Sequence, residues 1–168
     1  MRLLIASVGK LKQGPERELC AHYLARTEAS GRNLGLFPVD LIEMPESKAG
    51  SASLRRDAEG AALLAKATPP LRLIALDPMG SQLDSEVFAS LLSKFRDTGA
   101  PGIAFLIGGA DGLGQQVLKQ AERTLSLGPM TLPHGLARIV LAEQLYRATT
   151  ILAGHPYHRG GDPKVKTS

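Results

Sequence analysis

Five consecutive residues near the C-terminus, His155-Pro156-Tyr157-His158-Arg159, bring together side chains that can handle protons and anions. The histidine imidazoles can exchange protons near neutral pH, and the tyrosine offers an aromatic ring and a hydroxyl group. The arginine guanidinium stays charged and can donate two parallel hydrogen bonds to one anion. A metal site is disfavoured because Pro156 fixes the backbone and no carboxylate lies in the motif to orient a ligating histidine. We therefore interpret this tail as a segment that binds RNA.

A second candidate pair lies just before the tail. Glu143 and Arg147 are four residues apart, so on a helix their side chains share a face and can pair. As an ordinary exposed ion pair they would contribute only about 0.3–0.5 kcal/mol, and the spacing alone favours that interpretation. His22 has no partner in reach along the sequence and is interpreted as structural.

Glycines and small residues follow three apolar runs, in the stretches 76–80, 108–114 and 128–133. In open parallel sheets, ligands bind beyond the carboxyl ends of the strands, where such loops lie. Glycine lets a ligand approach the backbone closely. The alternative for the stretch 108–114 is a tight turn between a strand and a helix, with no ligand. Neither the dinucleotide pattern G-x-G-x-x-G, nor the P-loop, nor the G-x-S-x-G elbow occurs, so those enzyme classes are disfavoured.

Alternation of apolar runs and helical patterns places these residues on an α/β framework. We expect strands at 2–8, 37–43, 71–76, 103–107 and 125–127, with a turn at 77–80. Helices are expected at 15–29, 53–67, 85–96, 115–123 and 134–153. This order predicts one mainly parallel sheet with helices on both faces.

Composition agrees with a single globular domain. The chain has 168 residues, 43% of them hydrophobic and 21% charged. The single cysteine, Cys20, excludes an internal disulfide or a cysteine-based zinc cluster within one chain. No signal peptide and no membrane-spanning run are recognised, so we expect a cytoplasmic protein. The net charge of +4 is modest, and half of it falls on residues 155–168.

Several blocks of the sequence resemble the RlmH family of SPOUT-class methyltransferases, which act on RNA of the large ribosomal subunit. The blocks are Leu106-Ile107-Gly108-Gly109, Asp111-Gly112-Leu113, Leu125-Ser126-Leu127, Thr131-Leu132-Pro133-His134, Ala142-Glu143-Gln144-Leu145-Tyr146-Arg147-Ala148 and His155-Pro156-Tyr157-His158-Arg159. The resemblance runs from Met1 to Arg159. It implies one methyltransferase domain over residues 1–159, and leaves 160–168 as a flexible extension.

The resemblance implies a SPOUT-type α/β fold with a deep trefoil knot near the C-terminus, a homodimer, and bound S-adenosylmethionine without a metal. The residues it assigns to the cofactor are Leu76, Gly108, Gly109, Gly128, Pro129, Met130, Thr131, Leu132 and Pro133. The partner it implies is 23S rRNA in the assembled 70S ribosome, methylated at N3 of a pseudouridine in helix 69.

Methyl transfer to the nitrogen N3 requires loss of its proton, which a base or a stabilising positive charge would assist. The candidates are His155, Tyr157, His158 and Arg159, with Glu143 and Arg147 supporting the site across the dimer. The long apolar helix at 134–153 has more apolar surface than one sheet face needs, which fits a dimer interface. Three alternatives remain: a SPOUT enzyme with another RNA target, a ribosome-binding or assembly factor without turnover, and a generic nucleotide-binding module.

Overall fold

The computed structural model describes residues 1–155 and residue 157. The predicted extension at 160–168 lies outside the described residues. No helix in the described ranges is long and apolar enough to cross a membrane.

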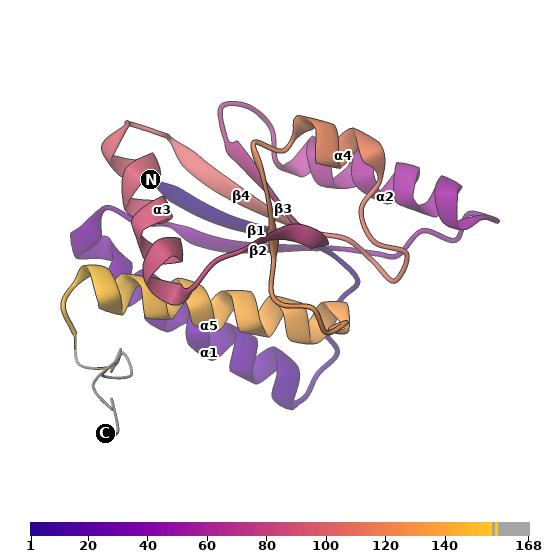
Figure 1. Cartoon of the computed structure of the whole chain (residues 1–168). Coiled ribbons are helices and arrows are strands. Elements are labelled where there is room, and N and C mark those ends of the chain that lie inside the picture. Colours follow the sequence, from indigo (N-terminus) through magenta and orange to yellow (C-terminus); the bar gives the residue numbers. More distant parts are fainter. Residues whose placement is uncertain (156, 158–168) are drawn as a thin grey trace, which may run out of the picture.

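A five-stranded sheet forms the centre of the fold (Figure 1). The strands lie in the order β2-β1-β4-β3-β5. Every pairing between them is parallel, which confirms the predicted α/β class. Their bounds are Arg2–Val8 for β1, Val39–Met44 for β2, Arg72–Gln82 for β3, Gly102–Ile107 for β4 and Arg123–Ser126 for β5.

Helices cover both faces of this sheet, as the sequence predicts. The helices α1 (Pro15–Gly31), α3 (Ser85–Asp97) and α5 (His134–Leu152) lie on one face. The helices α2 (Ala52–Lys66) and α4 (Gln115–Gln120) lie on the other, and a short 3-10 turn, η1 (Arg32–Leu34), follows α1. The trefoil knot stays a prediction from the family resemblance.

The central strand β4 shows how the two cores are separated. All of its residues are buried, and successive side chains point to opposite faces of the sheet. Phe105 packs into the core shared with α3 and α5, whereas Ala104 and Leu106 pack into the core shared with α2 and α4. A strand that is buried on both faces consists of a continuous run of apolar residues, which is why the sequence pattern predicted β4 correctly.

The two predicted boundaries that differ most from the structure lie beside β5, while the predicted starts of β2 and β5, at 37 and 125, lie at 39 and 123 in the structure. The strand β3 does not end in a turn at 77–80 but continues to Gln82, with a bulge between Leu76 and Ser81. Beyond the bulge, Ser81 resumes the pairing with β5 opposite Leu125. Helix α4 ends at Gln120 and not at 123, because the amide of Glu122 donates to the carbonyl of Leu73 and turns the chain into β5.

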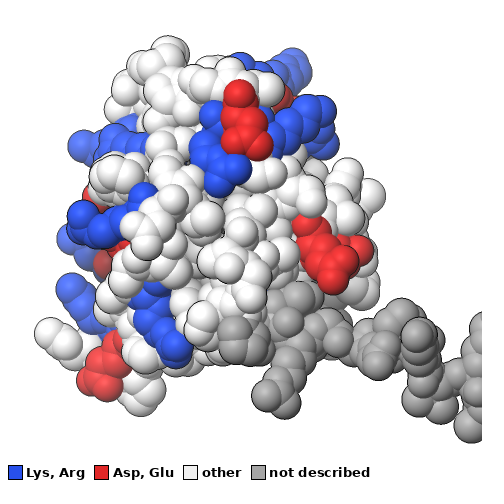
Figure 2. All heavy atoms as spheres, turned by 90° about the vertical axis from the view of Figure 1, so that its left-hand side faces the viewer, with Lys and Arg blue, Asp and Glu red and all other residues white. Residues whose placement is uncertain are grey.

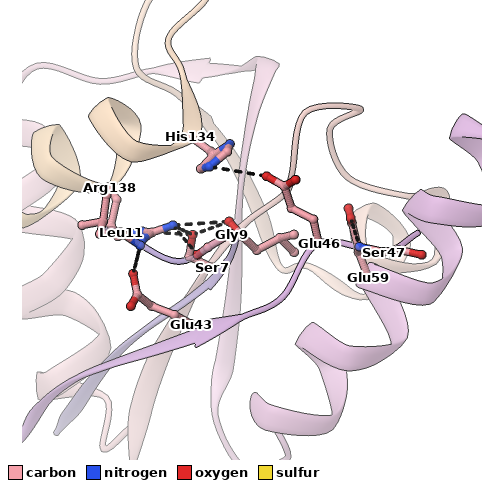
Figure 3. A network of polar contacts seen from close by, with 10 residues as sticks. Ser7, Gly9, Leu11, Glu43, Glu46, Ser47, Glu59, His134 and Arg138 are labelled. Atoms are coloured by element: carbon pink, nitrogen blue, oxygen red, sulfur yellow. Dashed lines mark hydrogen bonds and ion pairs between the residues drawn. The ribbon is translucent and has the colours of Figure 1, made fainter. Parts of the chain in front are cut away.

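A buried arginine fixes α5 against the strand ends (Figure 3). The Arg138 side chain is fully buried and donates to Ser7 Oγ and to the carbonyls of Val8 and Gly9, the last at 3.0 Å. It also pairs with Glu43 at the end of β2. Burial lowers the pKa of this guanidinium, and the Glu43 carboxylate opposes that effect. Helix α5 is therefore joined to the carboxyl ends of β1 and β2.

Replacing Arg138 with methionine is expected to destabilise the fold by about 3–5 kcal/mol, because it removes the ion-pair partner of the Glu43 carboxylate and a hydrogen-bond donor to two carbonyl groups. Urea unfolding measures the loss. The matched control is Arg2→Met, which breaks a pair with Asp40 whose side chains are both 40% exposed. That control should cost about 0–1 kcal/mol. Equal stability of the two variants would contradict the assigned role of Arg138.

Candidate active site

The carboxyl ends of all five parallel strands meet at one edge of the sheet, the right-hand side in Figure 1. A cavity of about 1120 Å³ opens at this edge. Its walls come from the bulge of β3, from the loops after β4 and β5, from Arg56 of α2, from Gln115 and Leu118 of α4, and from the first turn of α5. This is the position that strand topology predicts for a ligand.

The structure brings almost all of the predicted cofactor residues to this cavity. Of that set, Pro129 alone is not in the lining. Leu76 lies where the bulge of β3 begins, Gly108 directly follows the neighbouring strand β4, and residues 130–133 form the wall just before α5. Gly108 and Gly128 lie 32 and 52 positions after Leu76 in the sequence, and they share one surface with it because the parallel strands run toward the same edge.

The glycine loop at 108–114 is a tight turn and also a wall of the cavity. The amide of Gly112 donates to the carbonyl of Gly109 at 3.0 Å, and Gly112 has a positive φ of 80°. A Cβ atom on Gly108 would lie 2.7 Å from the carbonyl carbon and oxygen of Gly112. Glycine is required at position 108 because only hydrogen fits against that backbone. The two alternatives for this loop are therefore not exclusive.

An ion pair clamps the glycine loop to α2. The guanidinium of Arg55 donates to both carboxylate oxygens of Asp111, at 2.6 and 3.2 Å, and to the carbonyl of Ala49 at 3.1 Å. The hydrogen bond from Arg55 lowers the pKa of Asp111. The next residue, Arg56, lines the cavity. Sequence reasoning missed both arginines, because nothing local links position 55 to position 111.

Glu59 also lies against the glycine loop at 108–114. This carboxylate is only 6% exposed, and its Oε1 accepts the amide of Ser47 at 2.8 Å (Figure 3). Its Oε2 has no hydrogen-bond partner among the described residues. A Cβ atom on Gly109 would lie 2.9 Å from that oxygen, so Glu59 and Gly109 restrict each other. Sequence reasoning also missed Glu59.

His134 is a further cavity residue that the sequence analysis left without a role. Its imidazole lies against Gly9, and its Nε2 is 3.7 Å from Glu46 Oε1 (Figure 3). It is the first residue of α5 and lines both the main cavity and a smaller cavity beside the loop at 10–16. The available signal was its place directly after the predicted cofactor stretch, as the first residue of the predicted helix. No group of three His, Cys, Asp or Glu residues that could hold a metal occurs in the described part of the chain.

The predicted catalytic residues that the structure describes lie elsewhere, at the C-terminal half of α5. Arg147 Nη2 donates to Glu143 Oε1 at 2.5 Å, and the Tyr157 hydroxyl donates to the same oxygen at 3.3 Å. The Arg147 guanidinium lies 5.1 Å from the centre of the Tyr157 ring. Burial raises the pKa of Tyr157, and Glu143 adds to that effect. His155 Nδ1 accepts the amide of Tyr157 at 3.1 Å.

Glu143 and Arg147 thus form the predicted pair, with side chains only 17% and 27% exposed, so they are not simply a solvent-exposed pair. His158 and Arg159 lie outside the described residues.

The cavity and this cluster occupy different parts of α5. Glu143 lies nine positions after His134 and six positions after Ala137, the last cavity residue of the helix, which corresponds to about 13 Å and about 9 Å along the helix axis. His155 comes after the end of this helix of 19 residues, which is about 28 Å long. Within one chain, the structure does not bring the described tail residues to the cavity.

Comparison with known families identifies the class of this α/β domain. Residues 1–158 match the family described as "Predicted SPOUT methyltransferase". The match covers nearly the whole chain, so the chain belongs to the SPOUT methyltransferase family.

Curated relatives narrow this class. The chain is 55% identical to "Ribosomal RNA large subunit methyltransferase H" of Xanthobacter autotrophicus, over 95% of this chain and 99% of the relative. Relatives with the same name from Methylocella silvestris and Rhodopseudomonas palustris are 51% and 50% identical over the same shares. The family resemblance predicted from the sequence blocks is thereby confirmed.

The Asp111–Arg55 clamp is expected to make the glycine loop sensitive to acid. Because the folded-state pKa of Asp111 is lowered, its contribution is complete above the ordinary aspartate pKa of about 3.9 and is lost as the pH falls through the lower folded value. The stability difference between the wild type and Asp111→Asn should therefore be largest near neutral pH and shrink in acid, as measured by urea unfolding across pH. A difference that stays constant with pH would contradict this role.

Proposed function

We propose that this protein transfers a methyl group from S-adenosylmethionine to RNA of the large ribosomal subunit. The observation that carries the proposal is the cavity at the carboxyl edge in a chain that is 55% identical to a large subunit RNA methyltransferase over nearly its whole length. The proposed target is N3 of pseudouridine 1915 in helix 69 of 23S rRNA, in the assembled 70S ribosome. Activity on ribosomes would place the protein in the cytoplasm.

The cavity lining suits this cofactor. Leu76, Ile107 and Leu125 offer apolar surface for an adenine ring, and the glycine loop offers backbone groups without side chains. The volume of about 1120 Å³ is sufficient for a molecule of that size. Residues 128–133 would enclose the cofactor from the side of α5.

When bound, S-adenosylmethionine supplies a methyl group that its positive sulfur has already activated. The protein's task is then to align the acceptor nitrogen and to assist the loss of its proton. Glu143 holds both Arg147 and the Tyr157 hydroxyl, so these two side chains are oriented together. The positive charge of Arg147 would stabilise the anion that develops on the pyrimidine ring.

The separation along α5 supports a homodimer in which the tail of one chain meets the cavity of the other. Exposed apolar side chains occur around the cavity and the first turn of α5, namely Met79, Met130 and Leu136, with exposed fractions of 91%, 80% and 41%. A second copy would cover such apolar surface. Each dimer would then contain two composite sites.

Methyl transfer tests the proposal directly. We expect label from S-adenosylmethionine to enter 23S rRNA of 70S ribosomes, with mass mapping to a single pseudouridine in helix 69. Free subunits serve as the comparison substrate. Incorporation at a different nucleotide would assign another RNA target, and tight cofactor binding without incorporation on either substrate would favour a non-catalytic assembly factor.

Truncation after Gly154 separates the two parts of the site. Because none of the described tail residues lines the cavity, the truncated chain should bind S-adenosylmethionine as the full chain does, measured by calorimetry. Its methyl transfer to ribosomes should be abolished. Full activity of the truncated chain would contradict the role of the tail.

Gly108→Ala tests the cavity wall. A Cβ atom there meets the Gly112 carbonyl group at 2.7 Å, so the loop must move. We expect S-adenosylmethionine to bind at least about tenfold more weakly, a change of about 1.4 kcal/mol in calorimetry. Gly50→Ala is the matched control, since a Cβ atom there has open space. Unchanged affinity in Gly108→Ala would place the cofactor elsewhere.

A further inference from the structure

A row of aromatic rings connects α1 with the C-terminal half of α5. The ring centres of Tyr23 and Tyr146 are 6.2 Å apart, and those of Tyr146 and Tyr157 are 4.7 Å apart. Two guanidinium groups lie over rings of this row. Arg26 lies 4.4 Å from the centre of the Tyr146 ring and 5.9 Å from that of Tyr157, and Arg147 lies 5.1 Å from that of Tyr157.

Arg26 differs from the other arginines around it. It is exposed, and its guanidinium has no ion pair or hydrogen bond within residues 1–155 and 157. Arg147, its neighbour across the rings, is paired with Glu143. On the face where the strands begin, basic and acidic side chains lie close together (Figure 2). Among the described residues, the ion pairs at this end of the sheet are Arg2–Asp40, Arg32–Glu28, Arg72–Glu122 and Arg96–Asp97.

The contact with Tyr146 leaves the N–H donors of Arg26 without a hydrogen-bond partner among the described residues. A guanidinium carries five N–H donors in a planar fork, and its position over the ring brings this fork next to Tyr157. Contact with the ring also restricts the side chain, which lowers the entropy lost when an anion binds. Phosphate oxygens match this donor fork, and their hydrogen bonds with arginine are charge-assisted.

We propose that Arg26 binds a phosphate group of the RNA substrate, beside the tail residues that handle the target nucleotide. This inference rests on the proposed function for the identity of the RNA. Tyr157 belongs both to the row of rings and to the Glu143–Arg147 cluster, so the phosphate lies next to the nucleotide that this cluster contacts. Tyr146 acts as a positioning residue, because Arg26 lies over its ring, and Tyr23 packs against Tyr146.

The test measures binding of the full-length protein to 70S ribosomes over a range of KCl concentrations at fixed Mg²⁺. Loss of one phosphate contact in Arg26→Ala should weaken binding about tenfold at low salt. It should also reduce the slope of log affinity against log salt by about 1. Arg26→Lys should keep the slope, since it retains the charge, but bind more weakly because it loses the planar fork.

Arg32→Ala is the matched control. Arg32 follows the same helix and lies 5.8 Å from the Phe37 ring, but Glu28 already pairs with it, so the slope should not change. An unchanged slope in Arg26→Ala would overturn the proposal, as would weaker binding that is independent of salt, which indicates base stacking. A changed oligomeric state of Arg26→Ala in light scattering would also overturn it, by placing Arg26 in a subunit interface.

The outcomes also separate this inference from the proposed function. If the wild-type protein methylates ribosomes and Arg26→Ala binds them with the wild-type slope, the inference on Arg26 fails alone. If the wild-type protein binds ribosomes without methylating them and Arg26→Ala still lowers the slope, the phosphate contact stands and the proposed activity fails.

Discussion

The buried contact between Arg138 and the strand ends is the constraint on which the rest of the molecule depends. A fully buried guanidinium is tolerated only where its donors are satisfied, and here Ser7, Glu43 and two carbonyl groups satisfy them. Since these partners lie at the ends of β1 and β2, the first turns of α5 cannot shift relative to the sheet. His134 and the wall at 130–133 directly precede this part of α5 in the chain, so the buried contact of Arg138 also restricts their positions.

The same helix contributes to both parts of the proposed composite site. Its first turn lines the cavity, Glu143 and Arg147 lie in its middle and C-terminal half, and Tyr157 beyond its end contacts Glu143. A cavity wall and a polar cluster are therefore built on different parts of one helix. In the proposed homodimer, association of two copies would let both parts act on one substrate.

Much of this architecture could be predicted from local sequence pattern. The apolar run of β4 and the glycines after it located a central strand and a cavity wall, because burial on both faces and close backbone approach each restrict residue type. The bulge in β3 was missed because its cause is the pairing of Ser81 with Leu125, far along the chain. The Arg55–Asp111 clamp was missed for the same reason, since pairing between distant side chains leaves no periodic signal.

Helix α5 also sets the distance and the angle between the cavity wall and the Glu143–Arg147 cluster of the proposed site. With Arg138 fixed, each inserted or deleted residue between it and Glu143 would move the cluster by about 1.5 Å and turn it by about 100° around the axis. Substitutions on the outer surface of the helix leave both the distance and the angle unchanged. The geometry therefore restricts the number of residues in this stretch more strictly than it restricts most of their identities. Sequence variation here should consist of substitutions and not of insertions or deletions.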